Sequence, residues 1–97
     1  MILHTLSTMP SSDAARRCVE VASTNDALIL LGEGVYAAMA GDTENALATK
    51  APCTVFALLQ DVKAAGIEQR LSPGVEVIDF AGFVALTEQY SKQQAWF

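Results

Sequence analysis

Continuous apolar runs alternate with mixed segments along the whole chain. The runs at 27–32 and 53–59 are hydrophobic throughout, a pattern typical of strands that are covered on both faces, as in a parallel sheet. The segments between such runs carry apolar residues at helical spacing, bounded by turn residues. We expect strands at 2–6, 27–32, 53–59, 75–79 and, as a short strand or packed tail, 94–97. We expect helices at 13–23, 33–41, 60–66 and 80–90, with a connector at 43–52.

Polar residues at the ends of these segments support the helix assignments. Ser11 or Ser12 is suited to cap the first helix, and Asp13 would lie in its first turn, where the helix dipole favours a negative charge. Gly66 is suited to end the third helix, and Asp61 and Asp79 are read first as helix N-caps.

The order of these elements predicts an α/β fold. Strands that alternate with helices form a parallel sheet through right-handed crossovers, with helices on both faces. A chain of 97 residues fits a single domain. We therefore expect one domain over residues 1–97, built on a mostly parallel sheet of four to five strands.

Composition and charge narrow the classes of function. Hydrophobic residues make up 52% of this small chain and charged residues only 18%, so part of the apolar surface is expected in a protein–protein interface. The net charge of -5 and the absence of a basic run disfavour direct binding of nucleic acid or an anionic membrane. One His and two isolated Cys predict no metal site. The chain shows no secretory signal and no apolar run of about 18 residues, so we expect a cytoplasmic protein.

The carboxyl ends of the predicted strands are where chemistry gathers in such sheets. The stretch Gly32–Ala37 follows a strand and matches G-x-G-x-x-A, which leaves two interpretations. It is either a small nucleotide-binding module or a tight strand-to-helix turn that requires glycine, and the turn is favoured because the helix is short. His4 is expected to be a hydrogen-bonded core or interface histidine, since no nucleophile is spaced to use it.

The two cysteines have different settings. Cys53 begins an apolar strand and is expected to be a buried, inert thiol. Cys18 lies near the middle of the apolar arc of the first helix, between Ala14 and Ala22. Spacing alone favours a packed thiol there, although the small alanines of this arc would cover it only thinly.

The succession of several stretches resembles the DsrH/TusB family of small sulfur-relay subunits, within the DsrEFH-like superfamily. These stretches are "ILHTLS", "ALILLGEGVYAAMAG", "VFALLQDVKAAGI", "VIDFAGFVALT" and "QAW", and together they extend over nearly the whole chain. The resemblance implies a DsrEFH-like parallel α/β fold. It also implies a role in passing persulfide sulfur between proteins, serving either 2-thiolation of the tRNA wobble uridine or dissimilatory sulfur oxidation.

The resemblance further implies a cytoplasmic complex without cofactors. Its sister subunits would be of the DsrE/TusD and DsrF/TusC types, usually in a heterohexamer, with a downstream acceptor of the DsrC/TusE type. DsrH-type members carry a cysteine in the first helix, and Cys18 occupies that place. The resemblance thus makes Cys18 the candidate persulfide carrier, while the main acceptor cysteine is expected on a partner. The alternative is a non-catalytic scaffold subunit in which Cys18 is buried and silent.

Overall fold

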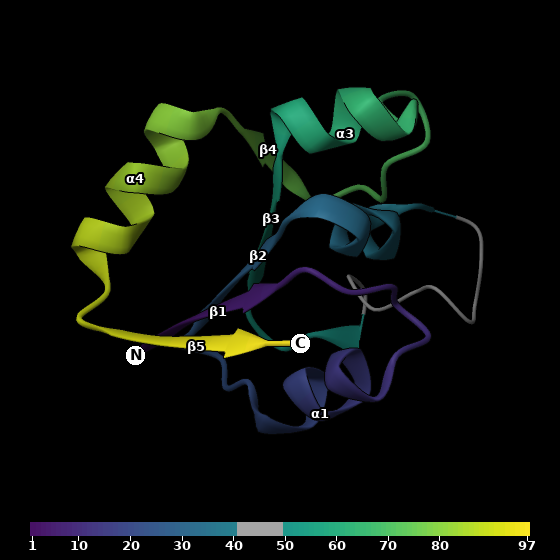
Figure 1. The fold of residues 1–97 in the computed structure, drawn as a ribbon. Helices are drawn as coiled ribbons and strands as arrows, with labels where there is room; N and C mark the ends of the chain where they lie inside the picture. The colour runs from purple at the N-terminus through teal and green to yellow at the C-terminus, as the bar shows by residue number, and fades with distance from the viewer. Residues whose placement is uncertain (41–49) are drawn as a thin grey trace.

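The architecture is a parallel sheet with helices on both faces, seen in a computed structural model that describes residues 1–40 and 50–97 (Figure 1). In these residues the strands follow the order β4-β3-β2-β1-β5, and every neighbouring pair is parallel. The strands are β1 (Ile2–Leu6), β2 (Ala27–Leu30), β3 (Thr54–Leu58), β4 (Glu76–Ile78) and β5 (Lys92–Trp96). The helices are α1 (Asp13–Val21), the 3₁₀ helix η1 (Gly32–Ala38), α3 (Leu59–Ala65) and α4 (Phe80–Gln89).

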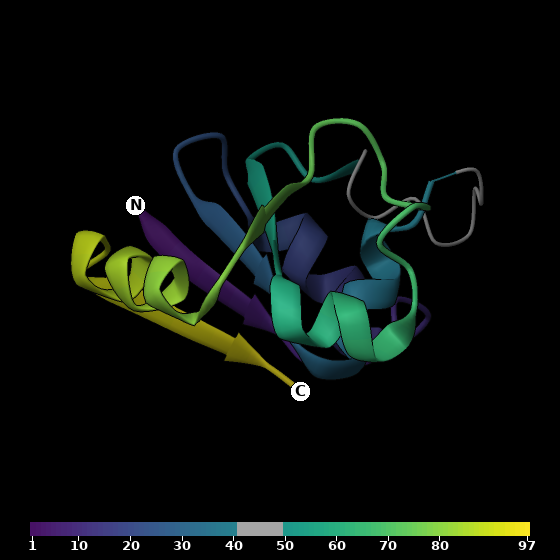
Figure 2. The same cartoon turned by 90° about the horizontal axis from the view of Figure 1, so that it is seen from above.

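The path of the chain explains why both faces are covered. It moves outward from β1 through β2 and β3 to β4, and then returns through α4 to place β5 on the other side of β1. Right-handed connections that run in opposite directions along a sheet lie on opposite faces. Accordingly, α1, η1 and α3 lie on one side of the strands and α4 lies alone on the other (Figure 2). The predicted fold class is confirmed.

Two apolar clusters hold these layers together. Successive strand residues point to opposite faces, so Leu28 and Leu30 pack beneath α1, η1 and α3, whereas Ala27 and Ile29 pack beneath α4. All four of these β2 side chains are fully buried. The continuous hydrophobicity of this strand therefore reflects its central position in the sheet.

The helix ends follow the predicted local chemistry at several points. The Ser12 hydroxyl accepts a hydrogen bond from the Ala15 amide, and the Asp79 carboxylate accepts one from the Gly82 amide, so both residues are N-caps. Gly66 ends α3 in the left-handed conformation. Asp61 is not an N-cap, contrary to the prediction, because α3 already begins at Leu59.

Other boundaries differ from the predictions for physical reasons. The strand β5 begins at Lys92, two residues before the predicted segment, and its first four side chains are exposed. Such an edge strand has no buried face to produce an apolar pattern. Cys53 lies just before β3 and is only partly buried. The segment after β2 winds as a 3₁₀ helix, while the predicted helix end near Gly41 and most of the connector at 43–52 lie outside the described residues.

None of the helices in the described part of the chain is both long enough and apolar enough to span a membrane.

Candidate functional site

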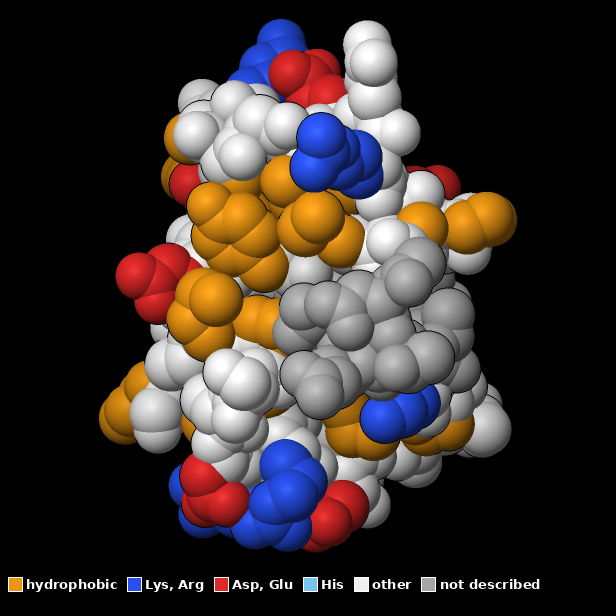
Figure 3. All heavy atoms as spheres, turned by 90° about the vertical axis from the view of Figure 1, so that its right-hand side faces the viewer, with side chains coloured by type: hydrophobic (Ala, Val, Ile, Leu, Met, Phe, Trp, Pro, Cys, Tyr) orange, Lys and Arg blue, Asp and Glu red, His pale blue; other side chains and the backbone are white. Residues whose placement is uncertain are grey.

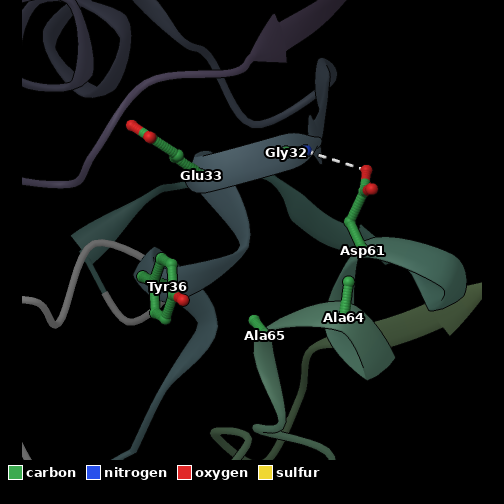
Figure 4. A pocket seen from close by; sticks show the side chains of 6 residues that line it. All are labelled: Gly32, Glu33, Tyr36, Asp61, Ala64 and Ala65. Atoms are coloured by element: carbon green, nitrogen blue, oxygen red, sulfur yellow. Dashed lines mark hydrogen bonds between the residues drawn. The ribbon is translucent and has the colours of Figure 1, made fainter.

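A shallow cavity lies at the carboxyl ends of β2 and β3, the edge at which sequence analysis placed candidate chemistry. Its volume is about 270 Å³. One wall is formed by η1 and the other by α3 (Figure 4), and the lining residues are Gly32, Glu33, Tyr36, Asp61, Ala64 and Ala65. The Asp61 carboxylate accepts a hydrogen bond of 2.8 Å from the Gly32 amide, which joins the two walls. The Glu33 side chain points away from Asp61, so the two carboxylates do not form a pair (Figure 4).

The glycines of the G-x-G-x-x-A stretch are accounted for by the fold itself. A Cβ atom on Gly34 would overlap the Leu6 carbonyl oxygen, so η1 can cross the end of β1 only without a side chain there. Gly32 has a φ of 51°, which an L side chain rarely adopts. The Gly32 amide donates to Asp61 and the Gly34 amide to the Leu31 carbonyl, so neither N–H is left for a phosphate. We therefore do not propose a nucleotide site at Gly32–Ala37.

Cys18 is completely buried in the larger core cluster. Its own helix supplies the buried alanines Ala14 and Ala15, and β2 and β3 supply Leu28 and Val55 to the same cluster. The sheet thus provides the cover that the small alanines of α1 cannot. Burial raises the pKa of the Cys18 thiol to about 12, with a further contribution from Cys53. In the chain alone, Cys18 is therefore a protonated thiol without solvent access, and the thiolate is the reactive form.

Cys53 is the more accessible of the two thiols. It is partly buried and packs against the same cluster, so the fold brings both cysteines to the face covered by α1, η1 and α3. Burial also raises the pKa of Cys53, and the negative charge of Asp26 adds to this effect. Cys53 was expected to be a buried thiol within a strand, and it is only partly buried because it precedes β3.

A buried polar chain runs from Asp26, at the amino end of β2, through His4 on β1 to Trp96, the last residue of β5. His4 on β1 is fully buried, and its Nε2 lies 2.8 Å from Oδ2 of Asp26, the residue that precedes β2. The indole N–H of Trp96 on β5 donates to His4 Nδ1 over 3.1 Å. An indole N–H can only donate, so Nδ1 accepts and Nε2 carries the proton given to Asp26. His4 is a hydrogen-bonded core histidine, as expected.

Asp26 anchors this chain of hydrogen bonds. Burial opposes a charge on its carboxylate, but hydrogen bonds from His4 and from the Ser23 and Ile2 amides outweigh that effect and hold the pKa of Asp26 well below its ordinary value. Sequence analysis did not single out Asp26 or Trp96. The sequence did contain a signal for this pair, because an Asp directly precedes one buried strand and a His lies inside another. A buried charge requires partners, so the two residues could have been expected to meet.

Charged side chains on the visible surface are mixed in sign. Figure 3 shows hydrophobic side chains across the middle of one face, with basic and acidic side chains close together toward its two ends. On α1, for example, Arg16 contacts both Asp13 and Glu20, and Arg17 contacts Asp13. The basic pair Arg16–Arg17 is thus neutralised locally, which agrees with the expectation that it forms no phosphate clamp.

The fold and this site define a class of protein: a small parallel α/β protein whose glycine turn and buried histidine serve its architecture. The family model described as "DsrH like protein" matches residues 8–93 of the chain. Two curated relatives are each called Protein TusB. That of Sodalis glossinidius (strain morsitans) is 35% identical and that of Salmonella enteritidis PT4 (strain P125109) is 37% identical, each over 95 residues that make up 98% of this chain and 100% of the relative. The chain belongs to the DsrH-like family.

Solved structures support the fold. The solution structure of protein Tm0979 from Thermotoga maritima has a TM-score of 0.71 at 22% identity and covers 92% of this chain and 93% of its own. The crystal structure of the ychN protein from E. coli has a TM-score of 0.74 at 16% identity and covers 98% of this chain and 97% of its own. At such identities these likenesses establish the architecture alone.

Proposed function

We propose that this chain is a subunit of a cytoplasmic sulfur-relay complex that serves 2-thiolation of the tRNA wobble uridine. The observation that carries the proposal is the match, over practically the full length of both chains, to proteins named TusB. The sulfur-oxidation branch of the family is the competing assignment. The partners in this proposal are sister subunits of the TusC and TusD types, with a TusE-type protein as the sulfur acceptor.

Within that complex we assign the chain a scaffold role. Cys18 has no exposed surface, and its raised pKa leaves a negligible thiolate fraction at neutral pH. Persulfide transfer requires a thiolate to attack a sulfane sulfur, and Cys18 in the free chain meets neither the charge nor the access requirement. The rival proposal is that Cys18 carries persulfide, which its position in the first helix supports. That role requires partner subunits to move α1 away from the sheet, so that the thiol becomes accessible.

The surface offers apolar area for such partners. Phe80 is 57% exposed and Val84 is 39% exposed on α4, one turn apart, and Val77 at the edge strand β4 is 36% exposed. Exposed apolar patches can mark surfaces that other proteins cover, and these neighbouring side chains support membership of a complex.

Complementation of a strain that lacks its TusB gene tests the proposal. We expect the chain, expressed with its own sister subunits, to restore 2-thiouridine in tRNA, measured by mass spectrometry of nucleosides. If the complex assembles but 2-thiouridine is not restored, the tRNA assignment is refuted.

The role of Cys18 is tested in the same strain. Under the scaffold proposal, Cys18→Ala restores 2-thiouridine as well as wild type does, and the matched variant Cys53→Ala behaves alike. Loss of the modification in Cys18→Ala alone, with the complex still assembled, would instead establish Cys18 as a carrier.

A further inference from the structure

The C-terminal strand is attached to the protein through very few side-chain contacts. Within residues 1–40 and 50–97, β5 is an edge strand and pairs with β1 alone. Its residues Lys92, Gln93, Gln94 and Ala95 are all exposed, and Trp96 alone is partly buried. Beyond the backbone ladder, β5 is held by this indole ring and by the exposed Gln93 side chain, which donates to the Thr87 carbonyl of α4 over 3.3 Å.

Trp96 makes three kinds of contact. Its ring packs against the larger core cluster, and the Arg17 guanidinium of α1 lies 5.9 Å from the ring centroid. Its N–H donates to Nδ1 of the fully buried His4. The hydrogen bond is the contact that depends on protonation, because Nδ1 accepts only while the imidazole is neutral.

A proton from solvent added at Nδ1 would have opposite effects on the two sides of His4. Toward Trp96, two N–H donors would face each other, and the indole would be left without an acceptor at a buried position. Toward Asp26, the bond from Nε2 would become a hydrogen-bonded ion pair, which is stronger than the present bond between a neutral imidazole and the carboxylate. The junction of β1 and β2 would hold while the junction of β1 and β5 weakened.

The other charged and titratable groups around His4 do not replace the lost acceptor. From β2 the facing group is Asp26, which is already bonded by two backbone amides. From α1 the groups are Arg17, a cation beside the indole, and Cys18, a buried thiol. Cys53 lies before β3 and is influenced by Asp26. Among the described residues, none of these groups is hydrogen-bonded to His4 Nδ1 or to the indole N–H, so neither donor would have a ready acceptor.

We propose that His4 and Trp96 form a pH-sensitive latch, in which protonation of His4 weakens the docking of Trp96, so that the strand β5 opens from β1 more often. The latch does not depend on the sulfur-relay assignment.

Hydrogen–deuterium exchange of the full chain, with its partners present if they are needed for folding, tests the latch. After correction for intrinsic exchange, we expect residues 92–96 to exchange about tenfold faster or more at about pH 5 than at about pH 8, the size expected for one lost buried hydrogen bond. The β2 and β3 segments should keep their protection. Equal protection of β5 at both pH values, or loss that spreads equally through β2 and β3, overturns the proposal.

Two variants separate the latch from general acid effects. His4→Gln carries no titrating ring, and Trp96→Phe keeps an aromatic ring but removes the N–H donor. In both, the exchange of β5 should become independent of pH. If His4→Gln does not fold, Trp96→Phe alone decides the matter, and acid-induced release that persists in Trp96→Phe overturns the proposal.

Discussion

Replacing Gly34 by alanine tests the close crossing of η1 over the end of β1. The added Cβ would overlap the Leu6 carbonyl oxygen and lie 3.0 Å from the Leu6 carbonyl carbon. Both atoms belong to the backbone of a strand paired on both sides, so they cannot move aside as a flexible side chain can. Overpacking of this kind costs about 3 kcal/mol, at the upper end of the usual range. The reduced entropy of the unfolded alanine chain offsets about 0.7 kcal/mol of it.

The net loss is therefore about 2 kcal/mol, which corresponds to a fall in Tm of about 8–16 °C for a protein of this size. Gly66→Ala is the matched control. Gly66 has a φ of 70°, but a Cβ added there would meet no atom within 4 Å, so only backbone strain of about 1 kcal/mol opposes the same entropic gain. Urea unfolding followed by far-UV circular dichroism gives both free energies. A Gly34→Ala variant as stable as Gly66→Ala would refute the crossing as described.

Three further predictions concern charge and thiol reactivity. Asp26→Asn should lower the free energy of unfolding at neutral pH by about 2 kcal/mol. Because the folded pKa of Asp26 is depressed, the extra stability of the wild type over Asp26→Asn is present above the ordinary pKa of 3.8 and shrinks as the pH falls below it. A pH series of urea titrations would show this, and a stability difference that grows in acid would contradict it. In native protein at about pH 8, a thiol reagent should modify Cys53 before Cys18, and peptide mapping that finds Cys18 modified first would contradict the burial described. With a net charge of -5, the chain alone should not shift tRNA in a gel at moderate salt, whereas tight, steeply salt-dependent binding would contradict this.

The sequence predicted the sheet because burial on both faces leaves a strong pattern. Every residue of β2 is buried, and the hydrophobic run that encodes it required no knowledge of its neighbours. The strand β5 left no such pattern, because Lys92, Gln93 and Gln94 point to solvent and the strand is specified by pairing with a segment at the opposite end of the chain. Edge strands are for this reason harder to predict than central ones.

The candidate site shows the same division between local and distant causes. The need for glycine after β2 was predicted, but the reason, the Leu6 carbonyl of β1, belongs to another strand. Asp61 resembled an N-cap because its position in the sequence suits one, and only the fold places it against the Gly32 amide. The depth of Cys18 was underestimated because a helical wheel describes the cover from its own helix and not the cover from the sheet.

The adjacency of β1 and β5 has a consequence for the synthesis of the protein. Among the described strands, β1 leaves the ribosome first and is paired on one side by β5, with Ile2 opposite Lys92 and Leu6 opposite Trp96. Until β5 emerges, β1 presents an open row of backbone donors and acceptors, and His4 lacks the indole that occupies its Nδ1. The nascent chain can therefore close this side of its sheet only after residues 92–96 have left the ribosome, and the β1 edge stays open during that interval.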